Sequence, residues 1–154
     1  LIRIYDSTYH TENEALNVIL NEKTLLCNNK NIRFTCIVDG NALNFIENED
    51  IYSLFGNLID NSIEAVNQLD DNEKIISLKI KQVGNIVSIS IKNGYKGKIQ
   101  MENNLPLSKK EDNIHHGFGM KSIKMVCEKY NGNLRLNIEN NIFIVTILFI
   151  KRSD

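Results

Sequence analysis

The chain has 154 residues, 42% of them hydrophobic and 24% charged, which is typical of a single globular domain that can bury a proper core. Its formal net charge of −1 gives no reason to expect nucleic acid or an anionic membrane surface as a partner. No apolar run has the length of a membrane span, so we expect no direct membrane contact by this domain.

Three cysteines, Cys27, Cys36 and Cys127, show no Cys-x-x-Cys spacing. We predict that they are reduced thiols filling the core of a cytosolic protein. No signal peptide is visible. Because the chain begins at Leu1 and not at Met, we expect it to be part of a longer protein.

Residues 12–29 are the first predicted element, a helix, because apolar side chains recur there at helical spacing. Thr11, with Glu14 three residues later, indicates a capping box at its start. Residues 32–38 read Ile-Arg-Phe-Thr-Cys-Ile-Val and predict a strand, which a turn at residues 39–41 follows.

Residues 50–69 predict a second helix with two different faces. At about 100° per residue, one face gathers side chains that favour a core: Ile51, Leu54, Phe55, Leu58, Ser62, Ala65 and Val66. The other carries short amides and carboxylates in one stripe: Asn57, Asn61, Glu64 and Gln68, with Asp60 beside them. Such a stripe suits a metal ion and its waters. The alternative is an ordinary amphipathic helix, Asn-rich on its outer face because the whole chain is rich in Asn.

Residues 75–82 and 86–93 alternate apolar and polar side chains around Gly84-Asn85 and predict a β-hairpin. Residues 94–116 hold few apolar residues and the single proline of the chain, and they predict a long loop. A loop of this length in a compact domain is usually functional or disordered.

The last predicted helix, residues 119–130, follows directly on the glycines Gly117 and Gly119. Glycine permits close backbone approach, and a helix N-terminus favours phosphate, so the segment indicates a phosphate site. The alternative is a flexible loop followed by a surface helix, because Gly-x-Gly alone is a weak motif. Residues 133–138 and 142–150 predict a closing hairpin.

The order of these elements, in which hairpins are mixed with helices, predicts an α+β fold. We expect a two-layer α/β sandwich in which helices cover one face of a mixed, largely antiparallel sheet. Residues 1–154 are expected to form one domain.

Two of these segments resemble motifs of a known family. Gly-Asn-Leu-Ile-Asp-Asn-Ser-Ile-Glu-Ala, residues 56–65, resembles the N box of the GHKL superfamily of ATP-binding domains, and His-Gly-Phe-Gly-Met-Lys-Ser-Ile, residues 116–123, resembles its G2 box. Residues 11–23 look like the opening helix of one subfamily. Over nearly its whole length the chain is similar to the catalytic domain of Agr/VirS-type sensor histidine kinases, the peptide quorum-sensing receptors of Gram-positive bacteria. The resemblance implies the Bergerat-type ATP-binding fold.

The resemblance also implies roles for the stripe. Asn61 takes the place of the Mg²⁺-coordinating asparagine, and Asn57, one turn earlier, would contact phosphate or a metal-bound water. GHKL members that hydrolyse ATP have a glutamate at the position of Asn57. Because an amide accepts no proton at neutral pH, we expect transfer of the γ-phosphoryl to an incoming nucleophile instead. Glu64 departs from the family, which often has a lysine there, and is expected at the edge of the site.

The nucleotide-contacting residues are carried over from the same resemblance. Asn93 would accept the adenine amino group, and Gly97 would be the last glycine of a G1 box in which Tyr95 replaces the first. If this segment is a plain turn after a strand, adenine affinity should be weak. The residues expected along the phosphates are Gly117, Phe118, Gly119, Met120 and Lys121.

The histidines receive no catalytic role. His10 follows too few residues to lie on a phosphoacceptor helix, which we expect upstream of this chain. His115 and His116 are adjacent, which is poor geometry for binding one metal ion, and their role stays open.

The resemblance thus implies a protein histidine kinase domain, monomeric when isolated, that binds ATP and Mg²⁺. It would pass the γ-phosphoryl to a histidine on the dimerisation domain of the same membrane receptor, on the cytoplasmic side, for delivery to a response regulator. Two alternatives stay open. The first is a GHKL ATPase, which Asn57 disfavours, or an anti-sigma serine kinase, which we would expect to be a complete short chain with its own Met. The second is a docking module that no longer uses nucleotide, which the degenerate G1 region favours and which Asn61 and both glycines of the G2 box disfavour.

Overall fold

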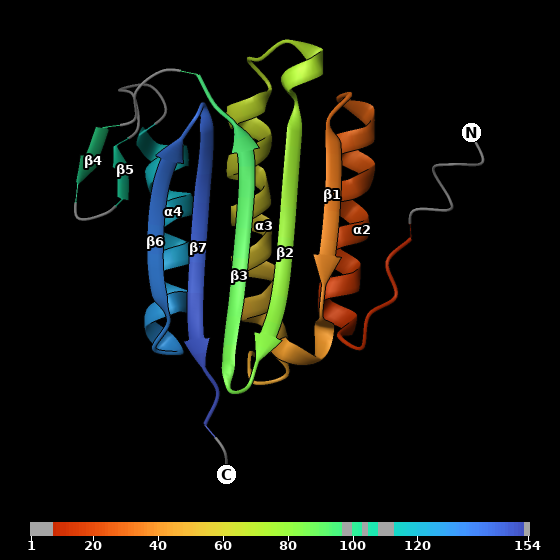
Figure 1. Ribbon diagram of the computed structural model, residues 1–154, viewed down its shortest axis with the longest axis vertical. Helices are drawn as coiled ribbons and strands as arrows, with labels where there is room; N and C mark the ends of the chain where they lie inside the picture. Colours follow the sequence, from red (N-terminus) through yellow and green to blue (C-terminus); the bar gives the residue numbers. More distant parts are fainter. Residues whose placement is uncertain (1–7, 97–99, 103–104, 108–112, 153–154) are drawn as a thin grey trace.

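The computed structural model describes residues 8–96, 100–102, 105–107 and 113–152. In this part of the chain, helices cover one face of a five-stranded sheet (Figure 1). The strand order is β1 (Arg33–Val38), β2 (Ile75–Val83), β3 (Ile86–Gly94), β7 (Ile142–Ile150) and β6 (Asn133–Glu139). The β1–β2 pair is parallel and the other pairs are antiparallel, so the expected α+β sandwich is confirmed.

Within the described residues, three α-helices lie side by side behind the sheet: α2 (Glu14–Asn29), α3 (Asn48–Val66) and α4 (Asn113–Lys129). The helix α3 lies in the middle and packs against both others (Figure 1). Short 3₁₀ helices at Gly40–Leu43 and Asp71–Glu73 lead into and out of the α3 segment, which forms the crossover between the parallel strands β1 and β2. No helix in the described part is long and apolar enough to cross a membrane.

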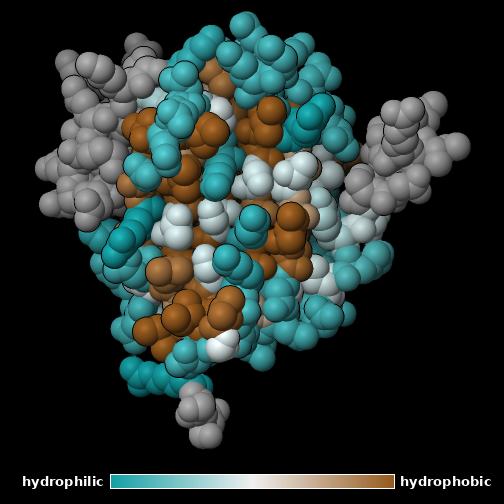
Figure 2. Space-filling view, viewed as in Figure 1, coloured by the Kyte–Doolittle hydropathy of each residue, from teal (hydrophilic) through white to brown (hydrophobic). Residues whose placement is uncertain are grey.

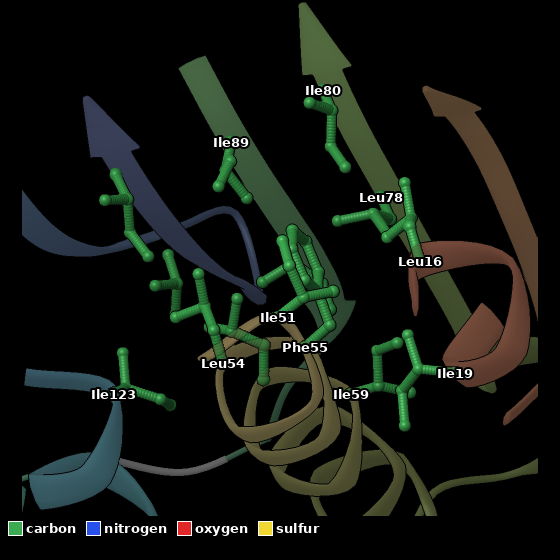
Figure 3. Close-up of a cluster of buried hydrophobic side chains, with 14 of the residues drawn as sticks. Leu16, Ile19, Ile51, Leu54, Phe55, Ile59, Leu78, Ile80, Ile89 and Ile123 are labelled. Carbon is green, nitrogen blue, oxygen red and sulfur yellow. The ribbon is translucent and has the colours of Figure 1, made fainter. Parts of the chain in front are cut away.

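The core lies between the sheet and α3 (Figure 3). Strands β2 and β3 alternate, so that Leu78, Ile80 and Ile89 point toward the helices. The apolar face predicted for α3 is confirmed, with the exception of Ala65, which is only half-buried. Phe55 is fully buried at its centre, which places α3 firmly on the sheet.

The opposite face of the sheet carries exposed cations and patches of exposed apolar side chains, among them the neighbours Val83, Ile86 and Ile150 (Figure 2). The cations are Arg33, Lys79, Lys81, Lys92 and Arg135. Among the described residues none of these five forms an ion pair. The formal net charge of the chain therefore does not reveal that cations gather on the open face of the sheet.

Several asparagines serve turns and helix ends. Asn140 and Asn141 both have positive φ, 50° and 63°, as a type I′ hairpin between β6 and β7 requires. Asn31 and Asn131, with φ of 58° and 57°, follow α2 and α4. In both cases the next N–H bonds a carbonyl five residues back, at 2.9 and 2.6 Å, which is a Schellman motif with Asn in the left-handed position.

The capping box predicted at Thr11 is wrong. The helix α2 begins at Glu14, and the Oδ1 of Asn13 accepts from the N–H of Leu16 at 2.9 Å. Asn is at least as good an N-cap as Thr, and Asn13 lies directly before the first helical residue. The Thr11 hydroxyl donates instead to Asn17 Oδ1 at 2.7 Å.

The loop predicted between β3 and α4 is also partly wrong. Strands β4 (Gln100–Glu102) and β5 (Leu105–Leu107) pair there as a separate two-stranded sheet. In addition, α4 begins at Asn113, so Gly117 and Gly119 lie inside the helix and not before it. A glycine within a helix costs only about 1 kcal/mol relative to Ala, which the packing of buried Met120 and Ile123 can outweigh.

Candidate functional site

The polar stripe of α3 divides into two parts. Asn57 and Asn61, one turn apart, are half-buried where α3 meets α4. Glu64 is exposed further along the helix, and Gln68 lies beyond its last residue and is exposed. The structure therefore brings the two asparagines of the predicted site together against α4 and leaves Glu64 toward solvent.

Gly119 is the residue of α4 that lies against these two amides. A Cβ atom at this position would be 3.2 Å from Asn61 Oδ1 and 3.5 Å from Asn57 Oδ1. The first distance is shorter than ordinary van der Waals contact between a Cβ and an oxygen, so a glycine gives the room that the amides occupy. The two sequence motifs, far apart in the chain, thus meet at one point.

Hydrogen bonds orient the two carboxamides. Asn57 Nδ2 donates to the carbonyl of Ser53 at 2.7 Å, and Asn61 Nδ2 donates to Met120 Sδ at 3.2 Å. The Oδ1 atoms of Asn61 and Asn57 are the two polar atoms nearest to the Gly119 Cβ position, with Asn61 Nδ2 next at 3.6 Å. Neither oxygen accepts a hydrogen bond from a described residue. Convergent neutral oxygens suit a Mg²⁺ ion that completes its shell with water and phosphate oxygens.

The described residues do not form a closed metal site made of protein ligands alone. In the described ranges, no group of three or more His, Cys, Asp or Glu side chains lies close enough to hold a metal ion. Mg²⁺ retains several waters and is commonly held by few protein groups together with a nucleotide. The amide pair fits that shared arrangement, and it fits a closed structural site poorly.

Asn93 occupies the position that the sequence suggested, at the end of β3. It is 5% exposed, and it pairs in register with buried Ile76 of β2, so it lies on the helix-covered face. Its Nδ2 donates to the carbonyl of Gly94 at 2.8 Å. A buried amide held in this way has an orientation fixed by the backbone, as recognition of a flat polar ligand edge requires. Gly97 lies outside the described residues.

The remaining predicted phosphate contacts lie on α4. Met120 is buried against Asn61, whereas Lys121 is exposed. Gly117 and Phe118 belong to the helix, as do His115 and His116, but the placement of these side chains lies outside the described part. Of the expected residues, the structure therefore gathers Asn57, Asn61, Gly119 and Met120.

A cavity of about 410 Å³ opens at the end of the sheet near Tyr95. Asn93, Ser77, Lys92 and Ile142 are among its lining residues. Ser77 and Lys92 pair across β2 and β3 on the open face, opposite to the face where α3 and α4 lie. The cavity thus adjoins Asn93 but does not include the two amides of α3, and it is separate from the site at Gly119.

One polar pair next to the site was not anticipated. Lys23 of α2 is buried, and its Nζ lies 2.7 Å from Oδ1 of Asp60, the residue before Asn61. The sequence held a signal for it, because Lys23 falls at a position of the helical apolar pattern where a hydrophobic side chain would be ordinary.

A second polar cluster joins the far ends of α3 and α4. The Nζ of Lys129 lies 2.7 Å from Asp50 Oδ2, and the Tyr130 hydroxyl donates to the same carboxylate. These two hydrogen bonds hold the pKa of Asp50 below its usual range. The same hydroxyl accepts from the N–H of Glu47 at 3.1 Å, so the cluster ties the start of α3 to the end of α4.

Known proteins resemble this chain in sequence pattern and in fold. A family model described as the GHKL domain matches residues 46–150, which include α3, α4 and four strands of the sheet. Comparison with curated proteins finds no match. Among solved structures, the catalytic domain of histidine kinase ThkA in a nucleotide-free form superposes with a TM-score of 0.68 at 18% identity, covering 92% of this chain and 93% of that one.

Two further structures give the same result. Another nucleotide-free form of the ThkA catalytic domain has a TM-score of 0.65 at 17% identity, covering 94% of this chain and 97% of that one. Acinetobacter baumannii histidine kinase AdeS has a TM-score of 0.59 at 11% identity, covering 97% of this chain and 73% of that one. At such identities the likeness establishes the fold, and the fold agrees with the family match.

Proposed function

This chain belongs to the GHKL domain family, and we propose that it is the ATP-binding catalytic domain of a sensor histidine kinase. It binds ATP with Mg²⁺ and places the γ-phosphoryl for transfer to a histidine of a separate dimerisation domain. The likeness to histidine kinase catalytic domains over most of the chain supports this reading. It leaves other nucleotide-using GHKL functions as alternatives to be tested.

The observation that carries the proposal is the convergence of two amide oxygens at Gly119. Asn57 and Asn61 direct Oδ1 toward the same glycine, and Asn61 would be the protein ligand of Mg²⁺ there. The bound ion would neutralise phosphate charge. The chain's own part is to hold the two amides at a fixed distance from α4, through the bonds to Ser53 and Met120.

The absence of a carboxylate at position 57 favours transfer over hydrolysis. The Asn57 amide is already engaged with the Ser53 carbonyl, and it has no basic atom that could deprotonate water. Phosphoryl transfer relies mainly on positioning and on charge neutralisation, which this site can supply without a base of its own. The nucleophile would then come from the partner domain.

We assign the remaining ligand contacts by position. Asn93, buried at the end of β3, would accept a hydrogen bond from the adenine amino group. Gly97, Gly117, Phe118, Gly119, Met120 and Lys121 would line the nucleotide, with exposed Lys121 acting through its charge. These assignments rest on the motif resemblance together with the positions of Asn93, Gly119 and Met120.

We further propose that the domain belongs to an Agr/VirS-type membrane receptor of a quorum-sensing circuit, on the cytoplasmic side, and that it acts on a response regulator through the dimerisation domain. The N-box residues from Gly56 to Ala65 and the shortened glycine motif support this subfamily. Phosphotransfer to a purified dimerisation domain of such a receptor would test it, and failure with every such domain would reject the assignment.

Calorimetry with a non-hydrolysable ATP analogue tests the nucleotide site directly. We expect binding that strengthens with Mg²⁺ and that Asn61→Ala weakens by about tenfold or more, because it removes a metal ligand. Asn28→Ala, at an exposed asparagine of α2, is the matched control and should bind as the unsubstituted chain does. If millimolar analogue does not bind with or without Mg²⁺, the proposal fails and the docking-module alternative takes its place.

A further inference from the structure

The ion pair between Lys23 and Asp60 has an unusual position. Lys23 has a side chain only 11% exposed, whereas the side chain of Asp60 is 55% exposed. Lysine is rarely buried unless its charge is paired, and the 2.7 Å contact provides the partner. The pair joins α2 to α3 across their packed surface, and Asp60 is the only carboxylate in ion-pair contact with Lys23 among the described residues.

Asp60 shares its helical turn with the two asparagines of the site. Consecutive residues of an α-helix point about 100° apart, so Asp60 is directed toward α2 while Asn61 is directed toward α4. The rotation of α3 about its axis is therefore fixed from two sides. On one side the carboxylate of Asp60 holds Lys23, and on the other the amides of Asn57 and Asn61 lie against Gly119.

Hydrophobic packing alone fixes this rotation less sharply. Where α2 and α3 meet, Gly56 has Ile19 Cδ1 as its neighbour at 3.8 Å from a Cβ position, which is ordinary van der Waals contact. Such contacts tolerate small rotations, since apolar packing is not directional. A 2.7 Å bond to a buried ammonium is directional, and a rotation of α3 would break it and leave that charge unpaired.

We infer that Lys23 and Asp60 are positioning residues of the nucleotide site: their ion pair fixes the rotation of α3 so that the amide oxygens of Asn57 and Asn61 converge at Gly119. The inference rests on the proposed function. Neither residue contacts the ligand in this arrangement, because Asp60 faces α2 and Lys23 belongs to α2. Their effect on the ligand passes through the two asparagines.

Three substitutions test the inference. Lys23→Met keeps an unbranched side chain, one atom shorter, and removes its charge. Asp60→Asn keeps an acceptor for the ammonium and removes the carboxylate, and Lys23→Arg keeps the charge. The matched control is Lys74→Met, which removes the ion pair with Asp71 at 3.3 Å, away from α3. Two quantities are measured on each: the affinity for a non-hydrolysable ATP analogue with and without Mg²⁺, and the side-chain amide NMR resonances of Asn57 and Asn61 without nucleotide.

We expect Lys23→Met and Asp60→Asn to weaken Mg²⁺-dependent binding by about tenfold, as loss of a residue that orients a ligand-holding group does. Both should also shift the amide resonances of Asn57 and Asn61. Lys23→Arg should retain most of the affinity of the unsubstituted chain. Lys74→Met should change neither the affinity nor the resonances. Asp60→Asn retains a hydrogen bond to Lys23, so it provides a folded variant should Lys23→Met fail to fold.

A folded Lys23→Met or Asp60→Asn with unshifted resonances and unchanged affinity would overturn the inference and reduce the pair to a contribution to stability. If the unsubstituted chain does not bind the analogue, the proposed function fails instead. The resonances in the absence of nucleotide then still decide whether the ion pair positions the two amides.

Discussion

Gly119 illustrates how a single residue can serve the site and oppose stability. Gly119→Ala should raise helix propensity by about 1 kcal/mol, while its new Cβ would lie 3.2 Å from Asn61 Oδ1. We expect the free energy of unfolding to remain the same or to rise. We expect the affinity for Mg²⁺ and an ATP analogue to fall by about tenfold, because the amide must move by a few tenths of an ångström.

Gly56→Ala is the matched control for this prediction. Gly56 lies within α3, and its Cβ would meet only Ile19 Cδ1 at 3.8 Å. The substitution should stabilise the fold by about 1 kcal/mol and leave nucleotide affinity unchanged. Urea denaturation and calorimetry on both variants separate the two effects. Equal affinity in Gly119→Ala and in the unsubstituted chain would contradict the role of Gly119.

Asn57 sets the choice between transfer and hydrolysis in the proposed site. Asn57→Glu places a carboxylate one bond further out at the α3–α4 contact, where it can accept a proton from water. A general base commonly contributes a factor of about 10² to 10⁴, and even partial success should raise ATP hydrolysis at least about tenfold. Asn57→Gln has the same length and no basic group, so phosphate release by Asn57→Glu must exceed that by Asn57→Gln for the interpretation to stand.

At the scale of the elements, the sequence predicted the fold well and the glycine segment poorly. The helical period of α3 and the alternation of β2 and β3 arise from burial, which a sequence pattern reports directly. The helix α4 begins at Asn113, and no local pattern of the sequence marks this start, so glycines that suggested the beginning of a helix lie inside it.

In the candidate site, too, some residues could be predicted from local sequence motifs and others could not. Asn57, Asn61 and Gly119 were predicted from motifs, and the structure brings them together. The partnership of Lys23 with Asp60 could not be predicted in this way, because it joins two helices whose relative placement is set by the whole sheet. A buried lysine in an apolar helical pattern was its one local sign.

The cluster at the far ends of α3 and α4 predicts a dependence of stability on pH. The bonds from Lys129 and Tyr130 lower the pKa of Asp50, so the ionised carboxylate favours the folded state. This contribution is fully present above the pKa of the unfolded chain, about 4 for Asp, and is lost as the pH falls through the lower folded pKa. Asp50→Asn should therefore destabilise the protein at pH 7 and by progressively less below about pH 4.

Urea denaturation between pH 7 and pH 3 measures this difference. Glu49→Gln is a suitable control, since Glu49 is exposed in the same turn of α3 and forms no ion pair with a described residue. Its effect on the free energy of unfolding should be smaller at pH 7. A loss in Asp50→Asn that stays constant down to pH 3 would show that the cluster does not act through the charge of Asp50.

At the scale of the whole molecule, the sheet separates two surfaces. The proposed site lies on the helix-covered side, between α3 and α4. Exposed cations such as Lys79 and Arg135, which form no ion pair with a described residue, occupy the open side. Salt screens interactions between exposed charges beyond roughly 8 Å at physiological ionic strength. The net charge of the chain is therefore a poor guide to the field at either surface.

Chemical labelling of the three cysteines can measure local and global unfolding of this molecule. Cys27 and Cys127 are buried, whereas Cys36 lies half-buried on β1, an edge strand. Burial raises the pKa of each thiol to about 11, and the thiolate is the reactive form, so labelling at neutral pH requires an opening of the structure. An edge strand opens with a smaller free energy than the core does.

We therefore expect a thiol reagent to label Cys36 first, through local opening of β1, and Cys27 and Cys127 only at the rate set by global unfolding. Mass spectrometry of peptides from a labelling series in increasing urea gives the opening free energy at each site. The values for Cys27 and Cys127 should agree with the free energy of unfolding measured by circular dichroism. Labelling of Cys127 before Cys36 would mean that α4 separates from the sheet more readily than β1 does, and the amides at Gly119 would then lack a rigid support.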